Sequence, residues 1–217
     1  MKRVIIAGAS GLIGSNLLKL LLNKKEFGEV VVLVRKPLPL SNVKLVQIIT
    51  NFDSLEKVRN EIFGDALYCC LGSTKSKTPD VLDYRKVDHD YPVTLARIAS
   101  ENKVAQFHLI SSLGADTNSK IFYSKLKGET EKDIIEFSFK SIHIYQPSLL
   151  TGDRKENRWL ERLAITIMSI LNPFLMGSLK KYKSIKAITV AQAMINQTLK
   201  NVEGVHIYPS PIIKQLS

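Results

Sequence analysis

The chain has 217 residues, of which 45% are hydrophobic and 24% are charged. This size and composition are typical of one globular domain with a substantial core. The 31 basic residues outnumber the 20 acidic ones and give a formal charge of +11. They are scattered along the chain, and no nucleic-acid recognition module accompanies them, so we expect anionic small molecules and no nucleic acid as partners.

The cysteines and histidines give no sign of a disulfide or a metal site. Cys69 and Cys70 are adjacent within an apolar run, and the four histidines lack metal-ligand spacing. No signal peptide precedes the first expected strand, and no apolar stretch is long enough to span a bilayer. Two buried strand thiols fit a reducing compartment, so we expect a cytoplasmic protein without a metal.

The opening of the chain combines a strand with closely spaced glycines. Residues 2–7 predict a buried strand and residues 12–22 a helix, with Gly8, Gly11 and Gly14 at the junction. Glycine permits the sharp turn and the close approach of backbone to a pyrophosphate, and the helix start offers free N–H groups to the anion. The pattern predicts a dinucleotide cradle. The residues expected to contact the cofactor there are Gly8, Ser10, Gly11, Leu12, Ile13 and Gly14.

The end of the second expected strand, residues 30–34, bears on which dinucleotide is bound. NAD-binding chains commonly carry an acidic residue at this point, which accepts hydrogen bonds from the ribose 2′-hydroxyl. Here the strand runs into Arg35 and Lys36, and cations at this place suit the 2′-phosphate of NADP. We therefore expect NADP(H) to be favoured over NAD(H). The alternative is that both are solvated loop charges before Pro37.

Strand-like and helix-like segments alternate along the following chain. Further strands are expected at residues 43–48, 65–70, 104–111 and 141–145, with helices at residues 54–60, 81–101 and 123–136. Such alternation predicts an α/β chain with a doubly wound parallel sheet, the Rossmann fold, whose ligands lie at the carboxyl ends of the strands.

The pattern is less regular after Gly152. A helix is expected near residues 157–171, a basic loop at 180–186, a helix at 190–199 and a short strand at 205–208. We expect residues 1–217 to form a single NAD(P)-binding domain. Within it, residues 153–217 contribute a small substrate-binding region, because loops at the carboxyl ends of strands carry specificity.

Residues 163–171 form the most apolar part of this region. They favour a core or homodimer contact. The alternatives are a lid over an apolar substrate or a helix on a membrane surface, with Arg158 and Lys180 among the nearby cations.

Candidate catalytic groups follow the fifth expected strand. Ser111 and Ser112 stand at its end, and Tyr123 and Lys127 lie four residues apart on one face of the next helix. An ammonium about 4 Å from a phenol favours the phenolate by roughly 4 kcal/mol at an effective dielectric constant of about 20, which suits a tyrosine to proton transfer near neutrality. The alternative is an ordinary exposed helix pair.

These residues and the glycine pattern resemble the short-chain dehydrogenase/reductase superfamily, whose catalytic set is serine with Tyr-x-x-x-Lys. The chain is similar in particular to the Tat-interacting oxidoreductase group of atypical members. The runs that carry this resemblance are residues 69–74, 87–91, 111–116 and 146–154. The resemblance covers most of residues 1–160.

The resemblance implies a role for each candidate. Ser112 would hydrogen-bond the substrate oxygen, with Ser111 as the alternative serine. Tyr123 would exchange a proton with the substrate, and Lys127 would hold the nicotinamide ribose. Asp88 stands where many extended members carry asparagine, which weakens the case for a proton relay through this position.

Further cofactor contacts are implied at the ends of other strands. Asp53 matches the acid that meets the adenine amino group, and a helix N-cap is the alternative. The remaining positions are Leu71, Gly72 and Ser73 beside the ribose and pyrophosphate, Ser111, Tyr123 and Lys127 near the nicotinamide end, and Pro147 and Ser148 flanking the nicotinamide.

The sequence thus predicts an NADP(H)-dependent oxidoreductase of atypical short-chain type, acting on a carbonyl or alcohol substrate by hydride transfer. One alternative is an NADPH-binding regulatory protein with little or no turnover. Another is a nucleotide-sugar epimerase-like enzyme. Substrate, reaction direction and oligomeric state are left open.

Overall fold

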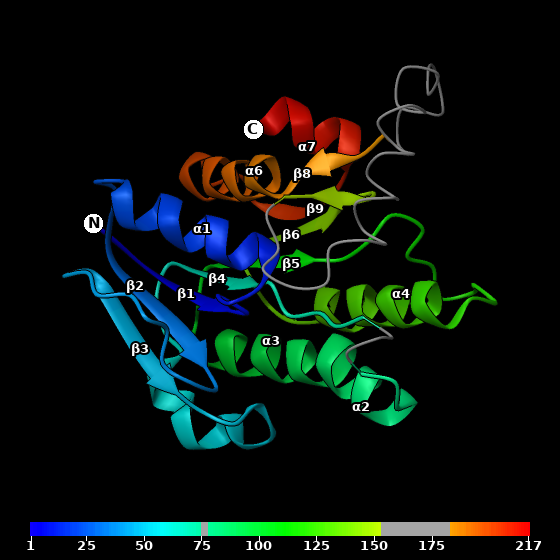
Figure 1. Ribbon diagram of the computed structural model, residues 1–217, viewed down its shortest axis with the longest axis horizontal. Helices are drawn as coiled ribbons and strands as arrows, with labels where there is room; N and C mark the ends of the chain where they lie inside the picture. The colour runs from blue at the N-terminus through cyan, green and yellow to red at the C-terminus, as the bar shows by residue number, and fades with distance from the viewer. Residues whose placement is uncertain (75–77, 153–182) are drawn as a thin grey trace.

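Seven parallel strands form the central sheet of the computed structural model, which describes residues 1–74, 78–152 and 183–217 (Figure 1). In spatial order they are β3 (Leu45–Ile49), β2 (Phe27–Val34), β1 (Lys2–Ala7), β4 (Ala66–Cys69), β5 (Gln106–Ile110), β6 (Ser141–Gln146) and β9 (Gly204–Pro209). The chain builds outward from β1 to β3 and then from β4 to β9. The strand order therefore reverses between β1 and β4, where doubly wound sheets bind ligands.

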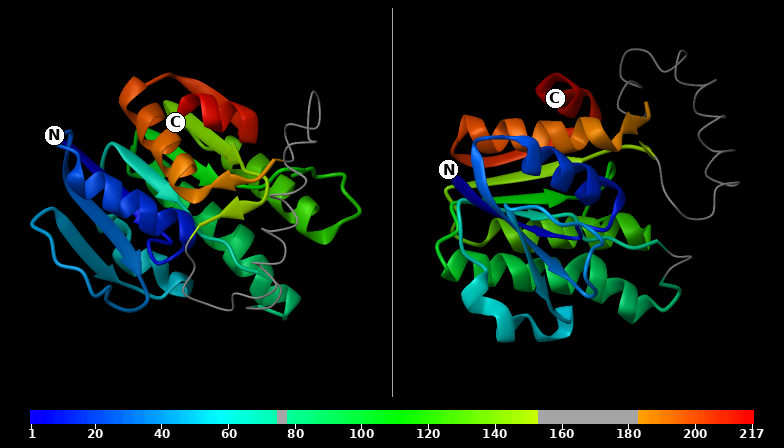
Figure 2. Two further views of the ribbon diagram at one scale, coloured as in Figure 1. Left: turned by 45° about the horizontal axis from the view of Figure 1, so that its top comes forward. Right: turned by 60° about the vertical axis from the view of Figure 1, so that its left-hand side comes forward.

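Helices cover both faces of the sheet, giving three layers (Figure 2). On one face lie α1 (Leu12–Asn23), α6 (Ala187–Lys200) and α7 (Ser210–Leu216). On the other lie η1 (Phe52–Glu61), α2 (Val81–Arg85), η2 (Lys86–Asp90), α3 (Tyr91–Glu101) and α4 (Phe122–Ile135). The expected doubly wound α/β fold is confirmed.

Side chains of the inner strands alternate between two apolar cores. Val4 and Ile6 of β1 pack into the core under α1 and α6, whereas Ile5 and Ala7 pack into the core under α3. All four side chains are fully buried. Burial on both faces explains why the inner strands read as continuous apolar runs.

The expected helix at residues 81–101 contains a π-helical turn, η2, between α2 and α3. Pro92 lacks the N–H that would bond the carbonyl of Asp88 in a regular α-helix. The hydroxyl of Thr130, on α4, donates to that carbonyl instead, across 3.0 Å. A contact between elements distant in sequence therefore satisfies the carbonyl in the irregular turn.

The remaining differences from expectation are small. Residues 52–61 form a 3-10 helix, which contains the helical stretch expected at 54–60. The helix α7 and the strand pair β7 (Leu150–Thr151) and β8 (Ile185–Lys186) were not expected. The described end of the chain joins the main fold, because β9 pairs with β6 and α6 packs beside α1.

The helix expected near residues 157–171 and the apolar segment 163–171 lie outside the described residues, so their alternatives stay open. Within residues 1–74, 78–152 and 183–217, no helix has the length and apolar character needed to cross a membrane.

Candidate functional site

The parallel sheet brings the predicted site residues to one edge. Each group follows the carboxyl end of a strand: the glycine turn after β1, Arg35 after β2, residues 71–73 after β4, residues 111–112 after β5 and residues 147–148 after β6. The topology thus gathers five separate sequence segments where doubly wound sheets bind ligands.

The glycine turn between β1 and α1 requires residues without a side chain. Gly8 has φ of +87°, and a Cβ on it would lie 2.5 Å from the carbonyl oxygen of Cys70. A Cβ on Gly14 would lie 2.2 Å from the carbonyl oxygen of Gly8. Gly11 is the N-cap of α1, so the helix has no side-chain cap, and its first turn has no acidic residue. Its first N–H groups therefore suit a pyrophosphate.

Arg35 and Lys36 are both exposed just beyond β2. Arg35 borders a surface hollow that is also lined by Ile49, Thr50 and Asn51 at the end of β3. A guanidinium here is accessible to a phosphate at the adenosine end of a dinucleotide.

Asp53 lies on the same side of the sheet, in the first turn of η1. The hydroxyl of Tyr91 donates to its carboxylate across 2.6 Å. The alternative that Asp53 caps this helix is wrong, because Asn51 is the cap and accepts the Asp53 N–H at 3.2 Å. Burial and the neighbouring Asp53 together raise the pKa of the Tyr91 phenol to about 12. The positive charge of Arg35 opposes this rise.

The loop after β4 is held by groups from the next helical segment. The N–H of Ser73 donates to Asp88 Oδ2 across 2.7 Å, and the hydroxyl of Tyr84 donates to the Ser73 carbonyl across 3.2 Å. Gly72 lies so close to this cluster that a Cβ on it would be 3.6 Å from Asp88 Oδ1. The loop expected beside the cofactor ribose is thereby fixed to α2 and η2.

Lys127 is buried, with 4% of its surface exposed, and its Nζ lies 2.8 Å from Asp88 Oδ1. Burial alone would lower the pKa of the Lys127 ammonium, but attraction to Asp88 and Tyr123 together outweighs it and holds the pKa above its ordinary value. The lysine is therefore not part of an ordinary exposed helix pair.

Tyr123 lies one turn earlier on α4 and is 39% exposed. Its ring centroid is 5.9 Å from Lys127 Nζ, and the ring of Tyr84 meets it edge-on at 6.4 Å. The helix thus presents an accessible phenol above a buried ammonium.

The two serines after β5 have different surroundings. The hydroxyl of Ser111 donates to the carboxylate of Glu131. The hydroxyl of Ser112 is buried and has no hydrogen-bond partner in the part of the chain that the structure describes. A buried hydroxyl without a partner calls for a ligand or water, whereas the Ser111 hydroxyl is already engaged by Glu131.

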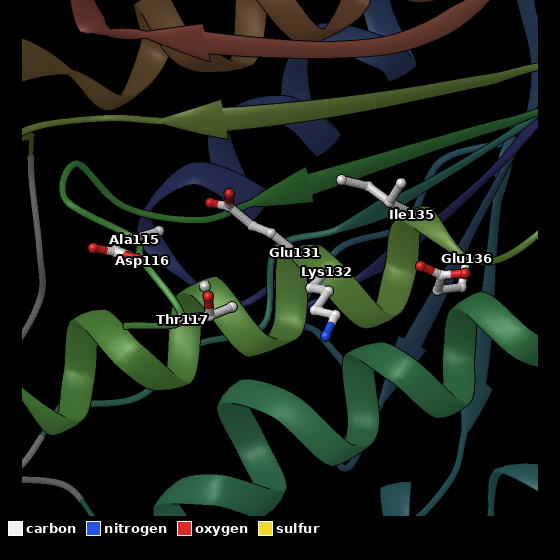
Figure 3. Close-up of a pocket in the computed structure, with 8 residues that line it drawn as sticks. Ala115, Asp116, Thr117, Glu131, Lys132, Ile135 and Glu136 are labelled. Atoms are coloured by element: carbon white, nitrogen blue, oxygen red, sulfur yellow. The ribbon is translucent and has the colours of Figure 1, made fainter. Parts of the chain in front are cut away.

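Glu131 is a site neighbour that the sequence reasoning missed. Besides Ser111, it accepts from Gln146 Nε2, which lies 3.0 Å from both carboxylate oxygens. Burial raises the pKa of Glu131, and these hydrogen bonds oppose the rise. Glu131 also borders a hollow between α4 and the loop at Ala115–Thr117 (Figure 3). The sequence could have indicated Glu131 as a site neighbour, because it lies four residues after Lys127 and therefore on the same helix face.

Pro147 and Ser148 follow β6 as expected, but their polar groups are engaged within the protein. The carbonyl of Pro147 accepts the N–H of Leu113 at 3.0 Å. The N–H of Ser148 donates to Ser210 Oγ across 2.7 Å, and its hydroxyl donates to the carbonyl of Lys183. These bonds tie the end of β6 to α7 and to the residues just before β8.

Fold and site together define a nucleotide-binding protein of the short-chain dehydrogenase and epimerase type. The chain belongs to the NAD(P)H-binding family, whose sequence pattern matches residues 8–144. Among its relatives is Protein HTATIP2 of Rattus norvegicus, which is 32% identical over 209 residues, covering 94% of this chain and 84% of that protein. The expected kinship with the Tat-interacting group is confirmed.

Fungal proteins are similar in sequence to this chain to a comparable degree. Protein FMP52, mitochondrial, of Coccidioides immitis is 30% identical over 221 residues, covering 94% of this chain and 88% of that protein. The expectation of a cytoplasmic protein is contradicted, because this relative and that of Saccharomyces cerevisiae are named mitochondrial. Buried thiols do not distinguish the cytosol from another reducing compartment, which is why the inference failed.

Solved structures share the fold at low sequence identity. MoeE5 in complex with UDP-glucose and NAD superimposes with a TM-score of 0.68 at 16% identity, covering 94% of this chain and 74% of that one. UDP-glucuronic acid 4-epimerase from Bacillus cereus in complex with NAD gives 0.68 at 17% identity, with 95% and 76% covered. The chain therefore has an NAD(P)-binding, epimerase-like fold.

Proposed function

We propose that the protein is an NADP(H)-dependent oxidoreductase that transfers hydride to or from the carbonyl or alcohol carbon of a small-molecule substrate. The observation that carries this proposal is the buried Lys127 ammonium 5.9 Å from the ring of the accessible Tyr123. The unpartnered hydroxyl of Ser112 supports it, because a substrate oxygen would supply the missing hydrogen bond.

The chain's own groups account for the proton in this reaction. In the reducing direction, the substrate carbonyl oxygen accepts a hydrogen bond from Ser112 and a proton from the Tyr123 hydroxyl. Lys127 stabilises the phenolate that remains. The glycine turn after β1 and Arg35 would hold NADPH, which would supply a hydride to the carbonyl carbon; with the proton from Tyr123, the carbonyl would become an alcohol. The Tyr123 phenolate then regains a proton from solvent, which its exposure allows.

The preference for NADP(H) over NAD(H) is supported by Arg35. Its guanidinium is exposed beyond β2, beside the hollow at Thr50 and Asn51. The second strand ends without an acidic residue to receive a ribose 2′-hydroxyl.

Turnover of NADPH with a panel of aldehydes, ketones and alcohols tests the function. We expect Tyr123→Phe to lower turnover by about 100-fold or more and to leave the NADPH affinity nearly intact, because the phenol acts on the substrate oxygen. Lys127→Ala should damage both turnover and affinity. Lys125→Ala is the matched control, since this lysine is exposed on the same helix.

Near-normal turnover of the Tyr123→Phe protein would contradict the catalytic assignment. Tight NADPH binding without turnover of any compound in the panel would favour the regulatory alternative instead.

A further inference from the structure

The carboxylate of Asp88 lies between two hydrogen-bond donors in the interior of the site. Its Oδ2 accepts the backbone N–H of Ser73 at 2.7 Å, and its Oδ1 lies 2.8 Å from Lys127 Nζ. Only 1% of the Asp88 surface and 4% of the Lys127 surface are exposed. One side chain therefore joins the loop after β4 to the lysine on α4.

The chemistry of these neighbours selects a carboxylate at this position. A backbone N–H and an ammonium are both donors, and each faces a different oxygen of Asp88. Ionised aspartate offers an acceptor to both, whereas an asparagine amide offers one oxygen and turns an N–H₂ donor toward the other neighbour. The departure from the asparagine of many extended members is thus matched to its surroundings.

The fold holds this carboxylate in place through the π-helical turn. Asp88 lies within η2, where Pro92 leaves the Asp88 carbonyl without its helical donor. The Thr130 hydroxyl lies 3.0 Å from that carbonyl and 2.8 Å from the carbonyl of Leu126 on its own helix, so the two carbonyls share its one proton. The backbone of Asp88 is thereby bonded to the helix that carries Lys127.

The charge of Lys127 depends on the groups that face it. These are Asp88 from η2, Tyr123 and Glu131 from α4, and Cys69 from β4. Burial raises the pKa of the Cys69 thiol to about 12, so it is neutral near neutral pH. Asp88 makes the direct ion pair, and its attraction together with that of Tyr123 outweighs the cost of burying the ammonium. An amine this deeply buried readily loses its proton when its counter-ion is removed.

We propose that Asp88 is a positioning residue of the cofactor site, which keeps Lys127 as an ammonium and fixes it to the loop at residues 71–73. The charge that Lys127 presents to the cofactor ribose then depends on a carboxylate from a different element. This inference rests on the proposed function only for the statement that Lys127 faces the cofactor.

The first test follows the ionisation of Lys127 by NMR in the full chain without cofactor, with Lys127→Met to assign its signal. We expect Asp88→Asn to lower the pKa of Lys127 by about two pH units or more, because the buried ammonium then lacks its direct counter-ion. Asp83→Asn, which removes an exposed carboxylate paired with Lys86, should leave the pKa unchanged. An unchanged Lys127 pKa in the Asp88→Asn protein would overturn the proposal.

The second test measures NADPH affinity against pH by calorimetry. From about pH 6 to about pH 9, the Asp88→Asn protein should lose about tenfold in affinity relative to wild type as Lys127 loses its proton. Asp88→Glu keeps a carboxylate, so any loss of NADPH affinity in this variant should be the same at every pH. This variant also tests the proposal if the Asp88→Asn protein does not fold. A pH-dependent loss in the glutamate variant would overturn the proposal.

Neither readout measures turnover. Failure to reduce any carbonyl compound would therefore count against the proposed function alone, whereas a Lys127 ionisation insensitive to Asp88 would count against this inference alone.

Discussion

The imidazole rings of His108 and His143 stack with their centroids 4.5 Å apart on the face of the sheet covered by α6. The two residues are paired in register on β5 and β6, and His206 on β9 continues the row. Burial lowers the pKa of His143 to about 4, with a contribution from His206, and burial also lowers the pKa of His108. The two buried rings are therefore neutral at physiological pH.

Acid should destabilise the protein through these rings. An unfolded histidine has a pKa of about 6.5, so the unfolded chain takes up the proton before folded His143 does. The free energy of unfolding should fall as pH drops from about 6.5 to 4, by up to about 3 kcal/mol from His143. His143 faces His108, His206 and the hydroxyl of Tyr208.

Urea denaturation from about pH 6.5 to 4 should show a shallower fall in the free energy of unfolding for His143→Gln than for wild type. His206→Gln removes only the smaller contribution to the His143 shift, so it should flatten the fall less than His143→Gln does. Identical slopes for His143→Gln and wild type would exclude this role.

Arg35→Ala should weaken NADPH binding selectively. A charge-assisted contact to the 2′-phosphate contributes about 1.5–3 kcal/mol, so the ratio of NADPH to NADH affinity should fall at least about tenfold. Calorimetric titration with both cofactors measures the ratio. Lys140→Ala removes an exposed cation just before the amino end of β6, at the end of the sheet away from the cofactor site. This variant should leave the ratio of NADPH to NADH affinity unchanged. Equal losses for the two cofactors would show that Arg35 does not read the 2′-phosphate.

Gly14→Ala should disrupt the junction of β1 and α1. The added Cβ would lie 2.2 Å from the Gly8 carbonyl oxygen, so the helix must shift away from the turn. We expect a loss of about 1–3 kcal/mol in the free energy of unfolding and a marked loss of dinucleotide affinity. Denaturation and cofactor titration measure the two effects. Ser15→Ala, at the next position of the same helix, should change both much less. Wild-type affinity in Gly14→Ala would contradict the cradle assignment.

Thr130→Val should destabilise the π-helical turn. Valine matches the shape of threonine but removes the hydroxyl that donates to the buried Asp88 carbonyl, and losing this hydrogen bond should cost about 0.5–1.5 kcal/mol. Thermal and urea denaturation of the variant measure this cost. Thr130→Ser keeps the hydroxyl and should retain most of the stability. Equal stability of the valine variant and wild type would show that water replaces the hydroxyl.

The fold was largely predictable because each inner strand carries its own apolar pattern and most parallel connections contain a helix, the loop between β2 and β3 being an exception. The same holds for the cradle, since strand, glycines and helix are contiguous. Local patterns could not predict η2 or its bond to Thr130, because the donor comes from a helix much later in the chain.

The candidate site was predictable as a set of positions but not as a set of interactions. Tyr123 and Lys127 share a helix face by spacing alone. Whether Lys127 is exposed or buried against Asp88 depends on how η2 packs on α4, which no local pattern encodes. Likewise, the hydrogen bond of Ser111 to Glu131 depends on how α4 packs on the end of β5, which no local pattern encodes.

The pairing of β6 with β9 joins two strands that are far apart in the sequence and are therefore synthesised at different times. These neighbours pair from Ser141 with Gly204 to Gln146 with Pro209, so a chain leaving the ribosome displays β6 well before its partner strand has been made. Until then, the outer edge of β6 offers unpaired N–H and C=O groups that can template contact with another nascent chain. Chaperone protection should therefore matter most in the interval between the synthesis of these two strands.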